Sequence, residues 1–295
     1  MDNQNSSPLS SQEIEPVDYL VIGHITQDVI LGGFTLGGTV SYASLTALAL
    51  GKSVGIVTSA TLDIQLPEFR KIQVLKYPSH HTTTFENIQK PDHRIQIIHH
   101  LAERITAGQI PEVWRNSPVI HVGPVANEVD PEVFRIFKDS FVGVTPQGFM
   151  RQWDETGHIK QDTWRDADRI LPHVSAAVLS LEDVRSDEKV IENYVSHSQV
   201  LVVTEGARGA RLYWNGDMRY FVPPPSVEVD PTGAGDIFAT AFFIRYQKTR
   251  DPWEAARFAT ILAAHSVNRK GLAGIPTAEE VRTAEAEILV DVQRS

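Results

Sequence analysis

Short apolar runs bounded by turn residues recur along the chain, with helix-like stretches between many of them. These runs are Tyr19–Ile22, Val54–Thr58, Val119–Val122, Ala176–Leu179 and Val200–Val203. Strands that are covered on both faces of a parallel sheet give this pattern, because neither face meets water. The sequence therefore predicts an α/β fold with a doubly wound, mostly parallel sheet flanked by helices.

The helices that we expect lie at Ser41–Leu50, Pro131–Ser140, Asp187–Ser196, Gly235–Thr249, Pro252–Val267 and Thr277–Val290. The last three repeat apolar residues at helical spacing, and Thr277 with Glu280 fits a capping box. A chain of 295 residues can bury one substantial core, so we expect a single main domain over residues 16–295. Residues 1–15 are rich in Ser, Asn and Gln, which predicts a mobile tail.

One region breaks the alternation of strands and helices. It reads as three extended segments: Ile72–Tyr77, Thr82–Gln89 and Arg94–His99. Two of them alternate polar and apolar residues, as strands do when only one face is buried. Together with Val29–Leu36 they could form a small β lid over a site, with lid segments at about 29–36 and 72–99. The alternative is an edge extension of the main sheet.

Composition excludes several classes of protein. The net charge of -10 argues against a surface for nucleic acid or acidic membranes, which are bound mainly through Lys and Arg. No apolar stretch approaches the roughly 20 residues that a membrane helix needs. The sequence contains no cysteine, which excludes disulfides and thiolate chemistry and fits a cytoplasmic protein.

The sharpest motif is Asp-Pro-Thr-Gly-Ala-Gly-Asp at residues 230–236, between a Pro-rich extended segment and a strongly helical one. Glycines at 233 and 235 allow a tight turn that directs backbone amides toward an anion at the helix start. Asp236 then lies in the first helical turn, where a carboxylate can accept a proton from an attacking hydroxyl. An ordinary helix start with an acidic first turn explains the same residues equally well.

This motif resembles the C-terminal signature of the ribokinase-like (PfkB) family of carbohydrate kinases, Asp-Thr-Thr-Gly-Ala-Gly-Asp. The resemblance implies that Asp236 is the catalytic base and that Gly233, Ala234 and Gly235 form the anion hole. Pro231 replaces a Thr of the family pattern. The resemblance extends over roughly Tyr19 to Val290 and implies ATP as the phosphoryl donor.

The N-terminal part of the chain resembles the family's acceptor site. Gly23-His24-Ile25-Thr26-Gln27-Asp28 is similar to its first strand and substrate-binding aspartate, which implies that Asp28 binds substrate. Gly37 and Gly38 resemble the glycine pair that lets substrate approach the backbone. Tyr42 stands where the family often has Asn and would also contact substrate. Without the family, Asp28 reads as a helix cap or a solvated residue, and the glycines as a turn.

Two further segments resemble the family's nucleotide site. Residues 202–210 are similar to its strand and Gly-rich turn, which implies that Thr204, Gly206 and Gly209 contact the nucleotide, although a plain hairpin fits too. Asn268 and Gly271 fall where the family's chain passes the adenine.

Metal sites are implied less directly. Ser180-Leu181-Glu182-Asp183 lies where the family has Asn-x-x-Glu, so Asp183, with Glu182 as substitute, is the candidate for Mg²⁺ bound through water. Asp230 and Thr232 are candidates for a monovalent cation, K⁺. We interpret His80, His81, His99 and His100 as surface residues, because neighbours on a strand point to opposite faces.

Other details resemble the plant-type myo-inositol kinase branch of the family. They are the Thr-Leu-Gly-Gly stretch at 35–38 followed by an aromatic residue, the prolines before the motif, and a Gln-x-x-x-Arg-x-x-Asp pattern at Gln147, Arg151 and Asp154. Gln147 and Arg151 are therefore candidates for substrate binding. Arg151 paired with Asp154 on a helix surface is the alternative.

Taken together, these observations predict an ATP-dependent kinase that phosphorylates a hydroxyl of a small polyol or sugar, with myo-inositol as a candidate. Ribose, another sugar or a nucleoside is the alternative acceptor. A non-catalytic sensor of nucleotide or sugar is the alternative of another class, but a pure binder has no need of Asp236. The resemblance also leaves room for a homodimer formed through the lid.

Overall fold

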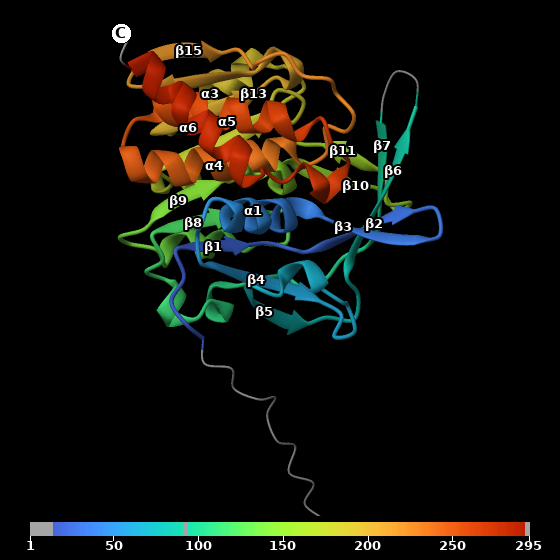
Figure 1. Cartoon of the computed structure of the whole chain (residues 1–295). Helices are drawn as coiled ribbons and strands as arrows, with labels where there is room; N and C mark the ends of the chain where they lie inside the picture. The colour runs from blue at the N-terminus through green and yellow to red at the C-terminus, as the bar shows by residue number, and fades with distance from the viewer. Residues whose placement is uncertain (1–13, 91–93, 293–295) are drawn as a thin grey trace, which may run out of the picture.

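The computed structural model describes residues 14–90 and 94–292. The predicted tail at residues 1–15 lies almost wholly outside the described residues. Within them, a nine-stranded sheet forms the centre of the molecule (Figure 1). Its order is β15 (Asp217–Phe221), β14 (Ala210–Trp214), β13 (Val200–Thr204), β12 (Ala176–Ser180), β9 (Phe141–Val144), β8 (Val119–Val122), β1 (Tyr19–Ile22), β4 (Val54–Ala60) and β5 (Gln73–Pro78).

Seven of these strands, β13 to β5, run parallel, while β14 and β15 add antiparallel neighbours at one edge. Alternate residues of β1 face opposite layers: Tyr19 and Val21 belong to one buried cluster, Leu20 and Ile22 to the other. Both faces of the sheet are therefore covered, which explains the continuous apolar runs and confirms the predicted fold class.

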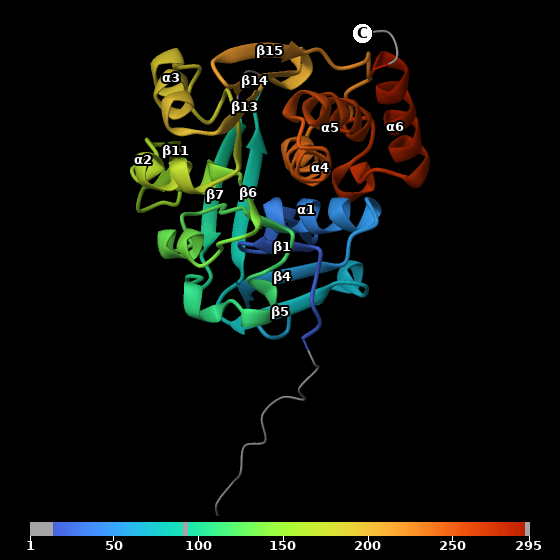
Figure 2. The same ribbon diagram turned by 90° about the vertical axis from the view of Figure 1, so that its left-hand side faces the viewer.

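Helices form a layer on each face of the sheet, as Figure 2 shows. One layer contains α1 (Gly38–Ala49), α4 (Ala234–Thr249), α5 (Pro252–Ser266) and α6 (Ala278–Val292); the other contains α2 (Ala167–Ile170), α3 (Glu188–His197) and several 3-10 turns. Thr277 and Glu280 exchange hydrogen bonds of 2.8 and 3.2 Å at the start of α6, so the predicted capping box is confirmed. No helix of the described chain is both long and apolar enough to span a membrane.

A second sheet stands beside the first (Figure 1). Its order is β3 (Gly33–Gly37), β2 (Thr26–Ile30), β6 (Thr83–Gln89) and β7 (Arg94–His100). We call these four strands the small sheet. A hairpin of β10 (Arg151–Trp153) and β11 (Ile159–Gln161) adjoins it, since the N–H of Ile98 donates to the Gly157 carbonyl at 2.9 Å.

Two predictions about secondary structure are wrong. The segment Ile72–Tyr77 does not join the small sheet: β5 pairs with β4 at the edge of the main sheet, where Val74 packs on one helical layer and Leu75 on the other. The edge extension that we considered therefore applies to this segment.

The expected helix at Pro131–Ser140 is only a 3-10 turn, Pro131–Arg135. Val133, Phe134 and Phe137 are buried against the second layer, and the chain then enters β9 at Phe141. Packing has overridden the local helical spacing. Strand β9 itself was not among the predicted strands.

Candidate active site

Five of the parallel strands end at the same edge of the main sheet. The segments after β1, β9, β12 and β13 contain the predicted residues Asp28 (on β2), Gln147, Asp183 and Gly206, respectively, and Gly123 follows β8. In open α/β sheets ligands bind at this carboxyl edge. The structure thus gathers predicted residues that lie up to 178 positions apart in the chain.

The glycine turn begins helix α4. Gly233 precedes the helix in the left-handed conformation, with φ 81°, and a Cβ atom there would overlap the ring of Tyr42. Only glycine fits both conditions. A Cβ on Gly235, in contrast, would meet no atom within 4 Å, so the first turn has an open side.

The backbone amides at this helix start are the expected anion hole. The N–H of Ala234 donates to the Pro231 carbonyl at 3.2 Å and is thus engaged within the turn. Gly235 and Asp236 lie in the first helical turn, where N–H groups have no partner inside the helix. These two amides, at the positive end of the helix dipole, are better placed for an anion than that of Ala234.

Asp236 is half-buried in the first turn of α4. Burial raises the pKa of Asp236 to about 6, although a hydrogen bond from the Thr39 side chain and the charge of Arg151 favour the ionised form. Asp183 repels that charge. A carboxylate with this pKa is ionised at neutral pH and still basic enough to accept a proton.

The residues predicted to hold the acceptor meet at the junction of β2, β3 and α1. A Cβ on Gly37 would overlap the carboxylate of Asp28, and one on Gly38, at φ 81°, would lie 3.0 Å from the His24 carbonyl oxygen. The glycine pair therefore lets the chain turn into α1 directly beside Asp28. The structure thus brings the three residues together, and their role in binding substrate stays a prediction.

Tyr42 lies beneath the glycine turn. Its side chain is 3% exposed, and its hydroxyl lies 3.8 Å from a Cβ built on Gly271. Burial and the charges of Asp236, Asp230 and Asp28 raise the pKa of Tyr42, so the hydroxyl is neutral at physiological pH. The ring thus spans from the acceptor side to the loop after α5.

Gln147, Arg151 and Asp183 form one cluster. The Gln147 amide donates to the Asp183 carboxylate at 3.2 Å, and the charge of Arg151 reaches both Asp183 and Asp236. Arg151 begins β10, not a helix, and its guanidinium lies 5.6 Å from the centre of the Phe85 ring. Sequence patterns assigned these residues separately to substrate and metal, whereas the structure brings them together.

The magnesium candidates differ in their surroundings. Asp183 is buried, which raises its pKa, and accepts hydrogen bonds from the Ser180 N–H at 2.9 Å and from Gln147. Glu182 is exposed. The described residues contain no group of three or more His, Asp or Glu that could hold a metal. The donor set fits an ion that keeps its own waters and is contacted by Asp183 through them.

The carboxylate of Asp230 joins two loops. It accepts hydrogen bonds from the N–H groups of Thr232 at 3.0 Å and Gly271 at 2.9 Å. Burial alone would raise the pKa of Asp230, but these bonds and the charge of Lys270 hold it below its usual range. Each carboxylate oxygen of Asp230 thus already accepts a hydrogen bond from the protein. A bound K⁺ would have to share these oxygens with the two N–H groups.

The predicted nucleotide residues follow β13. The Thr204 hydroxyl donates to the Leu179 carbonyl at 3.3 Å; Gly206 and Gly209 turn the chain with φ 60° and 99°. A Cβ on Gly206 would meet no atom within 4 Å. Asn268 accepts a hydrogen bond from the Val227 N–H at 3.1 Å, which ties the Pro-rich segment to the end of α5.

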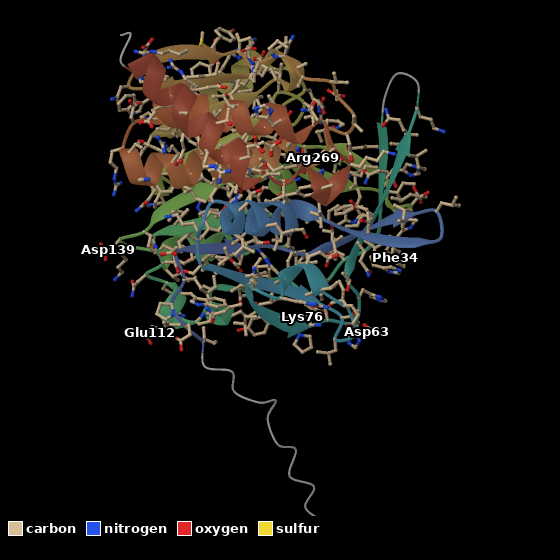
Figure 3. The ribbon with its side chains drawn as sticks, viewed as in Figure 1. Phe34, Asp63, Lys76, Glu112, Asp139 and Arg269 are labelled. Carbon is tan, nitrogen blue, oxygen red and sulfur yellow. The ribbon has the colours of Figure 1, made fainter. Side chains whose placement is uncertain are left out.

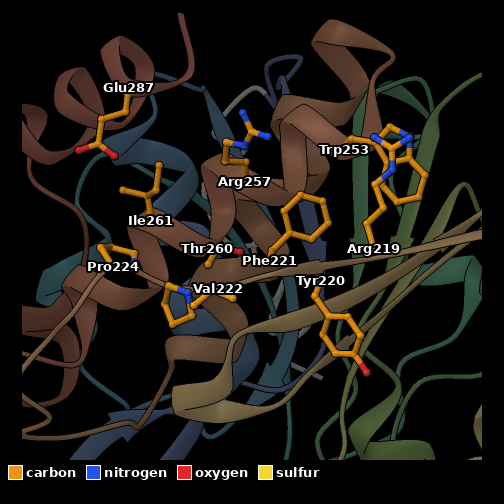
Figure 4. Close-up of a pocket in the computed structure, with 11 residues that line it drawn as sticks. Arg219, Tyr220, Phe221, Val222, Pro224, Trp253, Arg257, Thr260, Ile261 and Glu287 are labelled. Atoms are coloured by element: carbon orange, nitrogen blue, oxygen red, sulfur yellow. The ribbon is translucent and has the colours of Figure 1, made fainter. Parts of the chain in front are cut away.

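Beyond Gly209 lies a pocket of about 420 Å³ (Figure 4). A Cβ on Gly209 would overlap the Phe221 carbonyl, so the glycine turn adjoins the pocket wall. Arg219 stacks on Trp253 at 4.3 Å from the ring centre. Sequence reasoning missed this pocket, although the Pro223-Pro224 run was noted. Its lining residues are Arg219, Tyr220, Phe221, Val222, Pro223, Pro224, Trp253, Arg257, Thr260, Ile261 and Glu287.

Comparisons with known proteins agree with this geometry. Residues 161–278 match the model of the pfkB family carbohydrate kinases. Inositol 3-kinase of Zea mays is 28% identical over 286 residues, which cover 88% of this chain and 73% of the relative. Cytidine kinase of Thermococcus kodakarensis is 24% identical over 277 residues, covering 82% and 92%.

Solved structures show the same fold. A pyrophosphate-dependent kinase of the ribokinase family, complexed with a pyrophosphate analog and myo-inositol, has a TM-score of 0.74 at 18% identity and covers 90% of this chain and 99% of its own. Arabidopsis thaliana ribokinase, complexed with ribose and ATP, has a TM-score of 0.67 at 16% identity, with 91% and 98% covered. Residues 161–278 therefore match the pfkB family of carbohydrate kinases, and the chain shares the fold of the ribokinase-like structures.

Proposed function

We propose that the protein is an ATP-dependent kinase that phosphorylates a hydroxyl of a small polyol, with Asp236 as the catalytic base. One observation carries the proposal: a half-buried carboxylate with a pKa of about 6 lies in the same helical turn as the amides of the glycine motif. A general base and an anion site are thereby brought within one turn, as phosphoryl transfer to a hydroxyl requires.

The chemistry follows from this arrangement. As the oxygen of the acceptor hydroxyl bonds to the γ-phosphorus of ATP, Asp236 accepts the proton of that hydroxyl. The bond between the γ-phosphorus and the bridging oxygen breaks, and ADP is the leaving group. The N–H groups of Gly235 and Asp236 stabilise negative charge on the transferred group. Arg151, whose charge reaches Asp236, is a second candidate for this stabilisation.

A nucleotide donor is supported by the pocket beyond Gly209. Its volume and its aromatic and proline walls suit a planar base, while Gly206 and Gly209 allow phosphates to approach the backbone. The Arabidopsis ribokinase structure contains ATP. Another structural relative is pyrophosphate-dependent. Because pyrophosphate contains no base, this pocket would have nothing to bind if pyrophosphate were the donor here. Magnesium, contacted through water by Asp183, would neutralise charge on the donor phosphates.

The acceptor is proposed to rest on Asp28 and the backbone of Gly37 and Gly38, with Gln147 and Arg151 on the opposite side. Inositol 3-kinase among the relatives supports a cyclic polyol. Tyr42 is more buried than a wall of an open sugar site would be, so we propose that it shapes the floor of the site.

We also propose that the small sheet acts as the lid. The β2–β3 hairpin projects from the main body, with Phe34 near its outer end (Figure 3). Ile30, Leu31 and Phe34 are 51%, 103% and 57% exposed, an apolar tip that would suit contact with a second copy. Light scattering of wild type and of a Leu31→Glu variant would test the dimer: a wild-type monomer would contradict it.

A panel of donors and acceptors tests the function. Product formation is measured with ATP or pyrophosphate as donor and with myo-inositol, ribose, fructose, adenosine and cytidine as acceptors. We expect ATP to be the better donor and myo-inositol to have the highest kcat/KM among the acceptors. A higher value for ribose or a nucleoside would overturn the inositol assignment but keep the kinase; binding without transfer to any acceptor would favour a sensor.

A further inference from the structure

The site described above has a buried glutamate behind it. Glu128 is 2% exposed and lies in the loop after β8. Its carboxylate accepts hydrogen bonds from three backbone N–H groups: His24 at 3.1 Å, Val125 at 3.0 Å and Ala126 at 2.7 Å. A buried carboxylate held by amides fixes the position of each of those segments, because a lost bond would leave a buried group unpaired.

The segment fixed by Glu128 supports Arg151. The carbonyl of Val125 accepts a hydrogen bond from the Arg151 guanidinium at 2.8 Å, and the neighbouring Pro124 carbonyl accepts one from the Gly148 N–H at 2.9 Å. A Cβ on Gly148 would overlap the backbone of Pro124 and Val125, so the two segments are in direct contact. The whole stretch from Gln147 to Arg151 therefore rests on the loop that Glu128 holds.

The same carboxylate reaches the root of the small sheet through His24. The imidazole of His24 is fully buried; Nε2 donates to the Glu103 carbonyl at 2.9 Å, and Nδ1 lies 2.7 Å from the Thr83 hydroxyl. Thr83 is the first residue of β6, and Glu103 follows β7. Strand β2, which carries Asp28, begins two residues after His24.

From these contacts we infer that Glu128 is a positioning residue of the acceptor site. On one side, its hydrogen bond from the Val125 N–H fixes the segment whose carbonyl binds Arg151. On the other side, its hydrogen bond from the His24 N–H fixes the chain just before β2, the strand that carries Asp28. The donor residues at 204–209 and 268–271 are not among its contacts. This inference rests on the proposed function, since it names which half of the reaction Glu128 serves.

A double-mutant cycle tests the inference. Glu128→Gln keeps the shape of the side chain but turns one oxygen into an NH₂ group that faces N–H donors. We expect kcat/KM for the acceptor to fall roughly 10- to 100-fold, the scale of a small misplacement of a reacting group, with the KM for ATP changed less than about twofold. In an Arg151→Ala background the same change should cost less than in the wild type, because the part of its effect that passes through Arg151 is lost while the part that passes through His24 and β2 remains.

The control is Glu132→Gln, an exposed glutamate near Glu128 in the chain, which should behave as wild type. Full additivity of the two changes, or equal losses for acceptor and ATP, would overturn the inference. If Glu128→Gln does not fold, Glu128→Asp, which keeps the charge, is carried through the same cycle.

A second measurement separates this inference from the proposed function. If the wild-type protein transfers phosphate to no acceptor, the proposed function is wrong. In that case, amide exchange in the folded Glu128→Gln variant tests whether Glu128 is a positioning residue. We expect exchange to rise together at residues 124–126, 147–151 and 26–28, and to stay unchanged in β13. A rise confined to residues 124–126 would reject the positioning role.

Discussion

The ring of Tyr42 packs directly on Gly233, so that no side chain can be added at 233 without displacing it. Two elements almost 200 residues apart, α1 and the turn before α4, meet at this contact. The floor of the proposed acceptor site and the start of the helix that carries the proposed base are therefore built on one another.

Gly233→Ala should disturb this contact and strain the backbone, because Ala disfavours a φ of 81° by roughly 1–2 kcal/mol. We expect kcat/KM to fall about 100-fold and the melting temperature to fall. Tyr42→Ala removes the overlap but also a buried ring, so the double variant should lose less stability than the sum of the two single variants. Gly235→Ala, whose Cβ meets no atom within 4 Å, is the matched control for stability. Losses of melting temperature that add fully in the double variant would contradict the packing argument.

Asp236→Asn should lower turnover by roughly two to four powers of ten while ATP still binds. The reason is that the amide keeps the shape of the side chain but cannot accept the acceptor's proton. Turnover is followed by ADP release and ATP affinity by calorimetry. A variant that turns over at nearly the wild-type rate would remove Asp236 from the role of base.

The dependence of kcat/KM on pH should show the titration of the Asp236 carboxyl. Because burial raises the pKa of Asp236 to about 6, the base is protonated below that pH and the rate should fall about tenfold per pH unit on the acid side. Above pH 6 the carboxylate is ionised and this limb should level off. Steady-state rates between pH 4.5 and 8, with ATP saturating, measure the midpoint. A midpoint near 4 would mean that the carboxyl is not desolvated in the working enzyme.

Asp28→Ala should weaken acceptor binding by about 100-fold or more and leave ATP affinity unchanged. A carboxylate that pairs with substrate hydroxyls leaves them without a partner when it is removed. Each ligand is titrated separately by calorimetry. Asp139→Ala, at an exposed position on the side away from the small sheet (Figure 3), is the control. A comparable loss for both ligands would indicate that Asp28 supports the fold instead.

Amide exchange should slow in β2, β3, β6 and β7 when acceptor and a nonhydrolysable ATP analogue bind together. Closure over the acceptor excludes water, which would otherwise compete for the phosphoryl group. Strand β4, in the main sheet, serves as the internal reference. Protection that appears only around residues 233–236 would mean that the four strands are a fixed scaffold.

Much of the fold was predictable because its signals are local. Five strands and five of the six expected helices followed from apolar spacing, and the capping box at Thr277 needed only two residues three positions apart. The segment at Ile72–Tyr77 was ambiguous because an edge strand is also half-exposed. The turn at Pro131–Arg135 was missed because its conformation depends on where Phe134 packs.

The residues of the candidate site were predicted from the sequence, but the hydrogen bonds and packing contacts between them were not. The hydrogen bond between Gln147 and Asp183 joins residues 36 apart, one in the 3-10 turn after β9 and the other in the turn after β12, and no local pattern encodes it. The pocket beyond Gly209 arises where Phe221 meets Trp253 and Thr260 of α5. Such features depend on how elements pack, which spacing along the chain does not specify.

The residues proposed to hold the acceptor and those proposed to transfer phosphate lie mostly in different halves of the chain. Asp28, Gly37, Phe85, Glu128 and Arg151 all precede residue 161, where the match to the family model begins, while the glycine turn, Asp236 and the pocket beyond Gly209 follow it. Under the proposed roles, a change of acceptor would alter mainly the first half of the chain, with Tyr42 and Arg151 as the points where that half touches Gly233 and Asp236. Relatives that differ in what they phosphorylate would then diverge fastest before residue 161, and exchanging that half between them is a direct route to hybrid kinases.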